Sequence, residues 1–149
     1  MYTLPTYTIL NNEVVSLTGP GKGNSKIGGP SAIQTCILPL GWITGLSEMT
    51  KQERKKTVTD GCPRSCEHLS DCYAARGLAY ASLLSHARKI GRLIAQGSNP
   101  LIDIRGASLI RGGYFGDPSI TSEVAEFHIM LHGLAVNMGI PWRYYTATW

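Results

Sequence analysis

The feature that most constrains the fold is the alternation of helical and strand patterns in the second half of the chain. In residues 73–96 the apolar side chains recur at steps of three and four, the spacing of one face of an α-helix, and Gly97 offers a stop. Residues 101–105 alternate as a strand does, and a second helical pattern at 122–138 precedes the strand-like stretch 142–149. Strands that alternate with helices of this length predict parallel β-α units.

The first thirty residues predict a β segment instead of a further β-α unit. Residues 6–10 and 13–17 are rich in β-branched side chains and flank Asn11-Asn12, a pair typical of a hairpin turn. The glycine-rich stretch 19–30 follows. We interpret it as a connector, because it lacks the Gly-Lys-Ser/Thr ending of a phosphate-binding loop.

Residues 32–40 predict a buried strand, and 41–60 form a polar insertion before the cysteine-rich loop. A short helix is expected within this insertion, between Ser47 and Lys56. Two starts fit it, with Ser47 as the N-cap or with Thr50 and Glu53 as a capping box.

These patterns predict one α/β domain over residues 1–149, with a β hairpin and connector at 1–30 and β-α units at 31–149. The expected architecture is a partial (βα) barrel or a small open parallel sheet with an N-terminal β segment. A hydrophobic content of 43% with 16% charged residues agrees with a packed core. In such folds the loops that follow the strands gather at one edge of the sheet. We therefore expect the cysteine-rich loop and residues 112–118 to lie side by side there.

Three of the four cysteines, Cys62, Cys66 and Cys72, stand close together in the chain. Thiolates at this spacing can converge on one soft metal centre and leave one coordination position open. Residues 1–17 contain no secretory leader, and no run of apolar residues is long enough to span a membrane. We therefore expect a reducing, cytoplasmic setting, where clustered cysteines bind metal more often than they form disulfides.

An iron–sulfur cluster and a zinc ion are both candidates for this centre, and thiols without metal or a disulfide are the remaining interpretations. His68 completes a Cys3His set with the three cysteines, while His86 or Cys36 offers another fourth ligand. Cys36 itself is more typical of a buried core residue. His128 and His132 stand four apart on a predicted helix, and we interpret that pair as packing instead of metal ligation.

The motifs resemble those of a group of uncharacterised phage and plasmid proteins, which in turn look like distant relatives of radical S-adenosylmethionine (SAM) enzymes. The shared pattern is Cys-Pro-x-x-Cys followed by Cys-Tyr-Ala, a Gly-Asp strand end and a terminal Tyr-Thr-x-x-Trp. Here the matching segments are residues 23–28, 62–66, 72–74, 116–118 and 145–149.

This resemblance implies that Cys62, Cys66 and Cys72 hold a [4Fe-4S] cluster whose open iron binds SAM. It also implies a SAM pocket lined by Gly112, Gly113, Gly116, Asp117 and Pro118. The implied activity is reductive cleavage of SAM and abstraction of hydrogen from an unidentified substrate. Because the chain supplies about half the β-α units of a radical SAM barrel, a natural miniature, a homo-oligomer and a fragment of a longer product all fit.

The charge balance adds a non-enzymatic alternative. The 14 Lys and Arg residues exceed the 10 Asp and Glu residues, and the net charge is +4. The densest group of cations is Lys51, Arg54, Lys55 and Lys56 around Glu53. We interpret this group as a solvated segment in preference to a phosphate-binding patch. The alternative is a small zinc-stabilised accessory protein that binds nucleic acid or a host protein through this segment. Hydrolase motifs are absent from the sequence.

Overall fold

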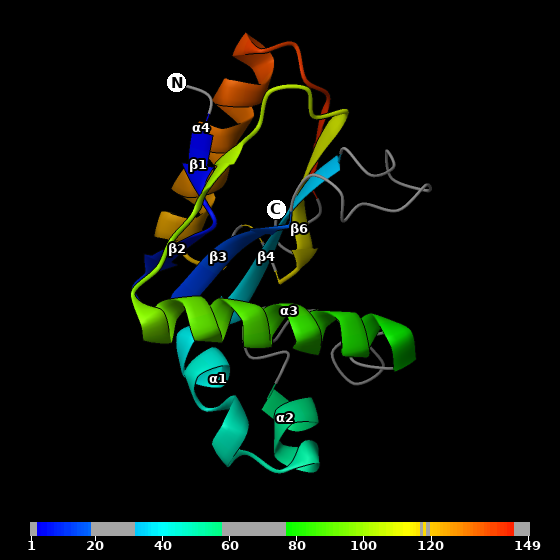
Figure 1. The fold of residues 1–149 in the computed structure, drawn as a ribbon. Helices are drawn as coiled ribbons and strands as arrows, with labels where there is room; N and C mark the ends of the chain where they lie inside the picture. The colour runs from blue at the N-terminus through cyan, green and yellow to red at the C-terminus, as the bar shows by residue number, and fades with distance from the viewer. Residues whose placement is uncertain (1–2, 19–31, 58–76, 117, 119, 145–149) are drawn as a thin grey trace.

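The computed structural model describes residues 3–18, 32–57, 77–116, 118 and 120–144, which form a mixed α/β fold. Its centre is a sheet with strand order β2-β3-β4-β6-β7 (Figure 1). The five strands are β2 (Tyr7–Leu10), β3 (Glu13–Thr18), β4 (Ala32–Pro39), β6 (Leu109–Phe115) and β7 (Trp142–Tyr144). Strands β2 and β7 are its two edges, so the sheet is open and is not a closed barrel.

The N-terminal half of the sheet is antiparallel, and the predicted hairpin is confirmed. Strands β2 and β3 pair across Asn11, whose φ of 59° is the left-handed conformation that asparagine tolerates in tight turns. Strand β3 then pairs antiparallel with β4, with Ser16 opposite Cys36. The predicted N-terminal β segment therefore joins the main sheet through antiparallel pairing, the arrangement that a two-residue turn requires of β2 and β3.

The C-terminal half is parallel, as predicted. Strand β4 pairs parallel with β6, and β6 with β7. Helix α3 (Gly77–Gln96) lies on the connection from β4 to β6, and α4 (Ser122–Asn137) on the connection from β6 to β7. The strand expected at 101–105 exists as β5 (Leu101–Asp103), but it pairs antiparallel with β1 (Thr3–Pro5) outside the main sheet.

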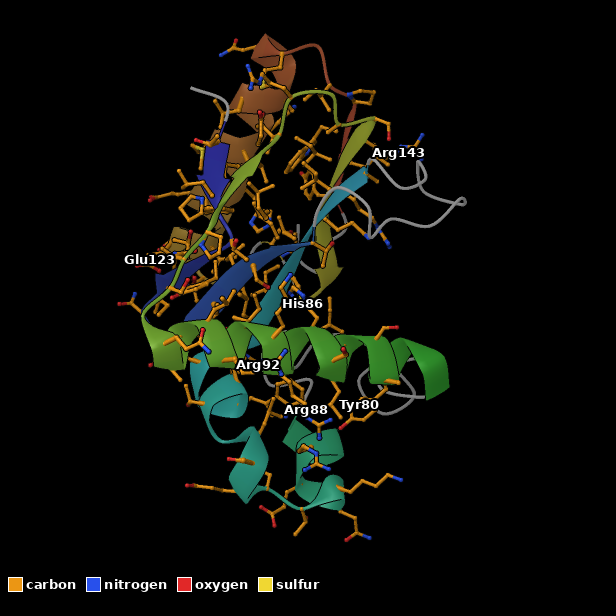
Figure 2. The ribbon with its side chains drawn as sticks, in the orientation of Figure 1. Tyr80, His86, Arg88, Arg92, Glu123 and Arg143 are labelled. Carbon is orange, nitrogen blue, oxygen red and sulfur yellow. The ribbon has the colours of Figure 1, made fainter. Side chains whose placement is uncertain are left out.

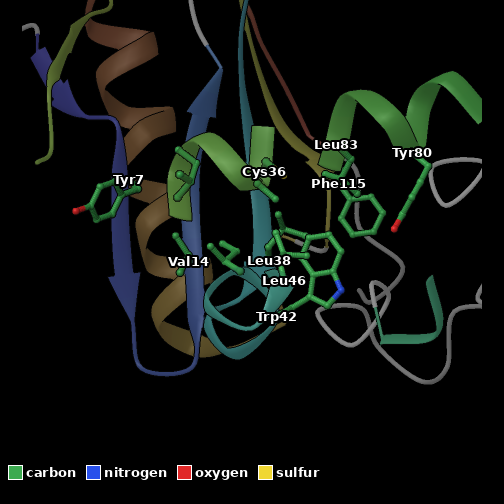
Figure 3. Close-up of a cluster of buried hydrophobic side chains, with 12 residues drawn as sticks. Tyr7, Val14, Cys36, Leu38, Trp42, Leu46, Tyr80, Leu83 and Phe115 are labelled. Carbon is green, nitrogen blue, oxygen red and sulfur yellow. The ribbon is translucent and has the colours of Figure 1, made fainter. Parts of the chain in front are cut away.

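Helices cover both faces of the sheet. On one face, α3 and the short helix α1 (Leu40–Thr44) pack against side chains from β3, β4 and β6. Figure 3 shows this cluster, with Phe115 beside Leu83 and Tyr80 of α3. On the other face, Leu131 and other side chains of α4 pack against a second cluster from β3, β4 and β6. Strand side chains alternate between these two cores, as the period of a strand requires.

The capping and stop residues predicted from the sequence can be compared with the helix ends in the structure. Thr50 caps α2 (Lys51–Thr57) by accepting the backbone N–H of Glu53 at 3.1 Å, so the second of the two predicted starts is confirmed. The Ser47 alternative falls in a 3-10 turn, η3 (Leu46–Glu48). Gly97 ends α3 with a φ of +67°. Within the described residues, no helix has the length and apolar character needed to cross a membrane.

Candidate functional site

The carboxyl ends of β4, β6 and β7 lie at the same end of the sheet, because the three strands run parallel. We call this end the carboxyl edge, which is distinct from the outer strands β2 and β7. The sequence predicts the functional residues at this edge. Cys62, Cys66 and Cys72 lie outside the described residues, as do His68 and Asp117. The described part of the edge is the end of β6, Pro118, the first turns of α4 and the end of β7.

The glycine pair at 112 and 113 lies inside β6, and the expectation that both belong to the loop after the strand is wrong. The register of β4 against β6 shifts here, since Gln34 pairs with Arg111 and Cys36 with Phe115. Strand β6 therefore carries extra residues opposite Thr35. Such a bulge needs a residue that accepts positive φ, and Gly113 has a φ of +80°.

The Thr35 side chain supplies a hydrogen-bond acceptor to the bulge, where regular pairing between the backbones of β4 and β6 is interrupted. The backbone N–H of Gly113 donates to Oγ1 of Thr35 at 2.7 Å, and Nε2 of His128 lies 2.8 Å from the same oxygen. The other ring nitrogen, Nδ1 of His128, lies 2.8 Å from the carbonyl oxygen of Val124, which can only accept. These partners assign the proton of a neutral His128 to Nδ1, with Nε2 accepting from the Thr35 hydroxyl.

Gly112 forms the floor beneath three side chains. A Cβ at this position would lie 3.0 Å from Cδ2 of His128, 3.1 Å from Cβ of Tyr144 and 3.2 Å from Cζ2 of Trp142. The absence of a side chain at 112 thus lets α4 and β7 approach the bulge. Its glycine is explained by this close packing.

A pocket of about 200 Å³ is lined in part by these three side chains. Its walls come from α4 and from β7: Ala125, His128, Ile129, His132, Trp142 and Tyr144. The rings of His132 and Trp142 are stacked, with centroids 5.4 Å apart and planes inclined by 12°. Walls that are mostly apolar and aromatic suit a small flat ring, which can stack on them and exclude water.

The structure brings some of the predicted SAM-pocket residues to this pocket and directs others elsewhere. Pro118 lines it. Gly112 does not line the pocket but lies against its lining residues His128, Trp142 and Tyr144, and Gly113 is hydrogen-bonded to Thr35. Gly116 instead faces β4, because a Cβ there would lie 2.7 Å from Cβ of Ile37. Its φ of +82° and its close contact with Ile37 are sufficient to explain a glycine at position 116.

The sequence signals for the pocket were partial. The four-residue spacing of His128 and His132 is visible in the sequence, and the interpretation as packing agrees with the buried ring and bonded nitrogens of His128. The sequence did not indicate a special role for Thr35, since threonine is common in β-strands. Trp142 and Tyr144 were expected only as part of a strand. In the described part of the chain, no group of three or more His, Cys, Asp or Glu side chains could hold a metal ion.

The remaining candidates lie apart from the pocket lining. Cys36 is fully buried in the core between the sheet and α3, as expected. Oγ of Ser16 lies 2.8 Å from Nε2 of His86, but Ser16 is only 1% exposed, so this pair is inaccessible as a nucleophile and base. Asp103 is paired with Arg105 on β5, outside the main sheet.

Comparison with protein-family models, with curated protein sequences and with solved structures finds no match to this chain. Function is therefore argued from the residues and their geometry.

Proposed function

We propose that this chain is a radical-SAM-like iron–sulfur protein of phage or plasmid type. In this proposal Cys62, Cys66 and Cys72 hold a [4Fe-4S] cluster that binds SAM. The observation that carries the proposal is the parallel pairing of β4 with β6. The chain leaves both strands at the same end of the sheet, and from β4 it continues through α1 and α2 before the cysteine-rich segment.

The packing of α3 supports the same juxtaposition. Cys72 stands five residues before Gly77, where α3 begins. The first turns of α3 pack on the carboxyl end of β6, since Tyr80 and Leu83 share one core cluster with Phe115. Helix α3, which follows the cysteine-rich segment in the sequence, thus packs on β6, the strand that precedes Gly116.

The donor set fits a cluster, because three thiolates are soft ligands and leave one iron open. The spacing here is Cys-x3-Cys-x5-Cys, which is longer than the Cys-x3-Cys-x2-Cys of radical SAM enzymes. When bound, the reduced cluster would supply the electron for reductive cleavage of SAM. The chain's own contribution is the pocket of His132, Trp142 and Tyr144, whose aromatic walls can stack on a flat ring such as adenine and keep water away.

Metal analysis of anaerobically purified protein tests the proposal. We expect brown protein with iron and acid-labile sulfide in equal amounts, and an electron paramagnetic resonance signal after reduction. Cys72→Ala should lose the iron and the colour. Cys36→Ala is the matched control, because Cys36 is buried in the core and should leave the iron content unchanged.

Two results would overturn the proposal. Colourless protein with stoichiometric zinc would make the cysteines a structural zinc site and favour the accessory-protein alternative. Iron that persists in Cys72→Ala would remove this residue from the ligand set.

A further inference from the structure

Charge is segregated between the two helical layers of the fold. Helix α3 contains no Asp or Glu, and its Arg88, Lys89 and Arg92 are all exposed. Helix α4, on the opposite face of the sheet, contains Glu123 and Glu126 and no Lys or Arg. Between these two described helices, the cations are therefore concentrated on the α3 side of the sheet.

The cations of α3 have no partners in the part of the chain that the structure describes. The side chains of Arg88, Lys89 and Arg92 make no ion pair or hydrogen bond there. Arg105, by contrast, is paired with Asp103 at 2.6 Å. Cations that are exposed and unpaired keep their full charge available for an anionic partner.

Helix α2 adds to the same side of the molecule. Its sequence, Lys-Gln-Glu-Arg-Lys-Lys-Thr, has four cations and one acid. Arg54 is held within this unit, since its guanidinium donates to the carbonyl oxygen of Met49 at 2.9 Å, whereas Lys51 is exposed and has no partner among the described residues.

Contacts through α1 fix α2 and α3 relative to each other. Nε1 of Trp42 donates to the carbonyl oxygen of Arg54 at 3.1 Å, and Ile43 packs against Gly91 of α3, where an added Cβ would lie 3.4 Å from it. Figure 2 shows Arg88 between α3 and α2, and Arg92 further along the same edge of α3. We call the side of the molecule formed by these two helices, with the exposed Lys51, Arg88, Lys89 and Arg92, the α2–α3 face.

We propose that the α2–α3 face binds the phosphate backbone of a nucleic acid. Exposed Lys and Arg that outnumber their acidic neighbours are the electrostatic footprint of phosphate binding. An anionic membrane is the less fitting partner, because surface helices that enter a bilayer carry bulky apolar side chains beside their cations. Exposed positions of α3 include Ala81, Ser82 and Ser85, and among the residues whose exposure the structure describes no large exposed apolar side chain lies on α2 or α3.

This proposal is independent of the cysteine site and predicts a measurable salt dependence. The probes are a fluorescent 20-mer duplex DNA and its single strand, titrated with the full chain at several salt concentrations. The test variant is Arg88→Gln/Lys89→Gln/Arg92→Gln, which removes three exposed cations. Each lost phosphate contact lowers the slope of log K against log salt by about 0.9, so the variant should lose about 2.7 of the slope on duplex DNA and bind about tenfold or more weakly at low salt.

A control removes exposed cations that lie on neither α2 nor α3. Arg105→Gln/Arg143→Gln takes two such cations, one from the turn after β5 and one from β7. It should retain most of the slope, and circular dichroism should show both variants to be folded.

The proposal is overturned if the wild-type chain binds neither probe at low salt, or if the control loses as much slope as the test variant. Preferential binding to phosphatidylserine vesicles, with no binding to DNA, would assign the face to a membrane instead.

Discussion

Oγ1 of Thr35 in β4 lies 2.8 Å from Nε2 of His128 in α4, although 93 residues separate the two in the sequence. The same oxygen accepts the backbone N–H of Gly113 at 2.7 Å. One hydroxyl therefore joins the central strand, the bulge of β6 and the helix that forms a wall of the pocket.

Thr35→Val should destabilise the protein although it conserves shape. The substitution leaves Nε2 of His128 and the N–H of Gly113 buried without their partner, and each unsatisfied group costs about 1–3 kcal/mol. We expect the free energy of unfolding to fall by about 2–4 kcal/mol in urea titrations. The control Thr18→Val removes only a weak 3.5 Å hydrogen bond on the neighbouring strand and should cost about 0.5 kcal/mol. Equal losses in the two variants would contradict the bridging role of Thr35.

Gly116→Ala should be more costly than Gly97→Ala, although both glycines have positive φ. At Gly97 a Cβ would meet nothing within 4 Å, so only the backbone strain of about 1–2 kcal/mol applies. At Gly116 the new methyl group also clashes with Ile37, and the total should be about 3 kcal/mol or more. Thermal unfolding of the two variants measures the difference. A Gly116 variant as stable as the Gly97 variant would contradict the contact with β4.

Ala125→Phe should fill the pocket and abolish the binding of a flat ring. Adenosine is the probe, and its affinity measured by equilibrium dialysis should fall about tenfold or more, which is a loss of about 1.4 kcal/mol. Val136→Phe is the matched control, because Val136 lies on the same helix, is 64% exposed and does not line the pocket. Iron content should be the same in both variants. Unchanged affinity in Ala125→Phe would show that adenosine binds elsewhere.

The pKa of Asp103 should respond to its neighbour Arg105. Hydrogen bonds from the Arg105 side chain and backbone N–H hold the pKa of this carboxyl below its ordinary value of 3.8. A carboxyl with a lowered folded-state pKa stabilises the fold above its unfolded value, and this contribution disappears as pH falls through the folded value. The effect on stability should be small, since the pair is exposed.

Carboxyl ¹³C chemical shifts recorded against pH test this pair. In Arg105→Gln the midpoint of Asp103 should rise toward 3.8, whereas Arg143→Gln should leave it unchanged. A midpoint of Asp103 that does not move in Arg105→Gln would assign the lowered pKa to another cause.

Local patterns in the sequence were sufficient for most of the elements. The hairpin around Asn11 and the Gly97 stop were predicted, and the Thr50 cap was one of two predicted starts for α2, because turns and caps depend on neighbouring residues. The parallel pairing of β6 with β7 also followed from local information, since a helix of α4's length joins strands in this way.

Other features could not be read from periodicity. The strand β5 has the same alternating pattern as any main-sheet strand, yet it pairs with β1 at the other end of the chain. Likewise, Gly112 and Gly113 look like loop residues in the sequence, and only the pairing with β4 makes them a bulge. Strand partners are chosen by burial and by contacts between distant segments, which a local pattern does not contain.

The sequence by itself determined the cysteine-rich segment as the chemical candidate and the order of helices and strands. Tertiary structure alone decided that Thr35, Gly113 and His128 share one hydrogen-bond chain and that Trp142 stacks on His132. The physical reason is that the spacing of the cysteines and the periodicity of a helix depend on residues that are close together in the chain. A buried hydrogen-bond chain, in contrast, exists only when packing has brought distant polar groups together and excluded water.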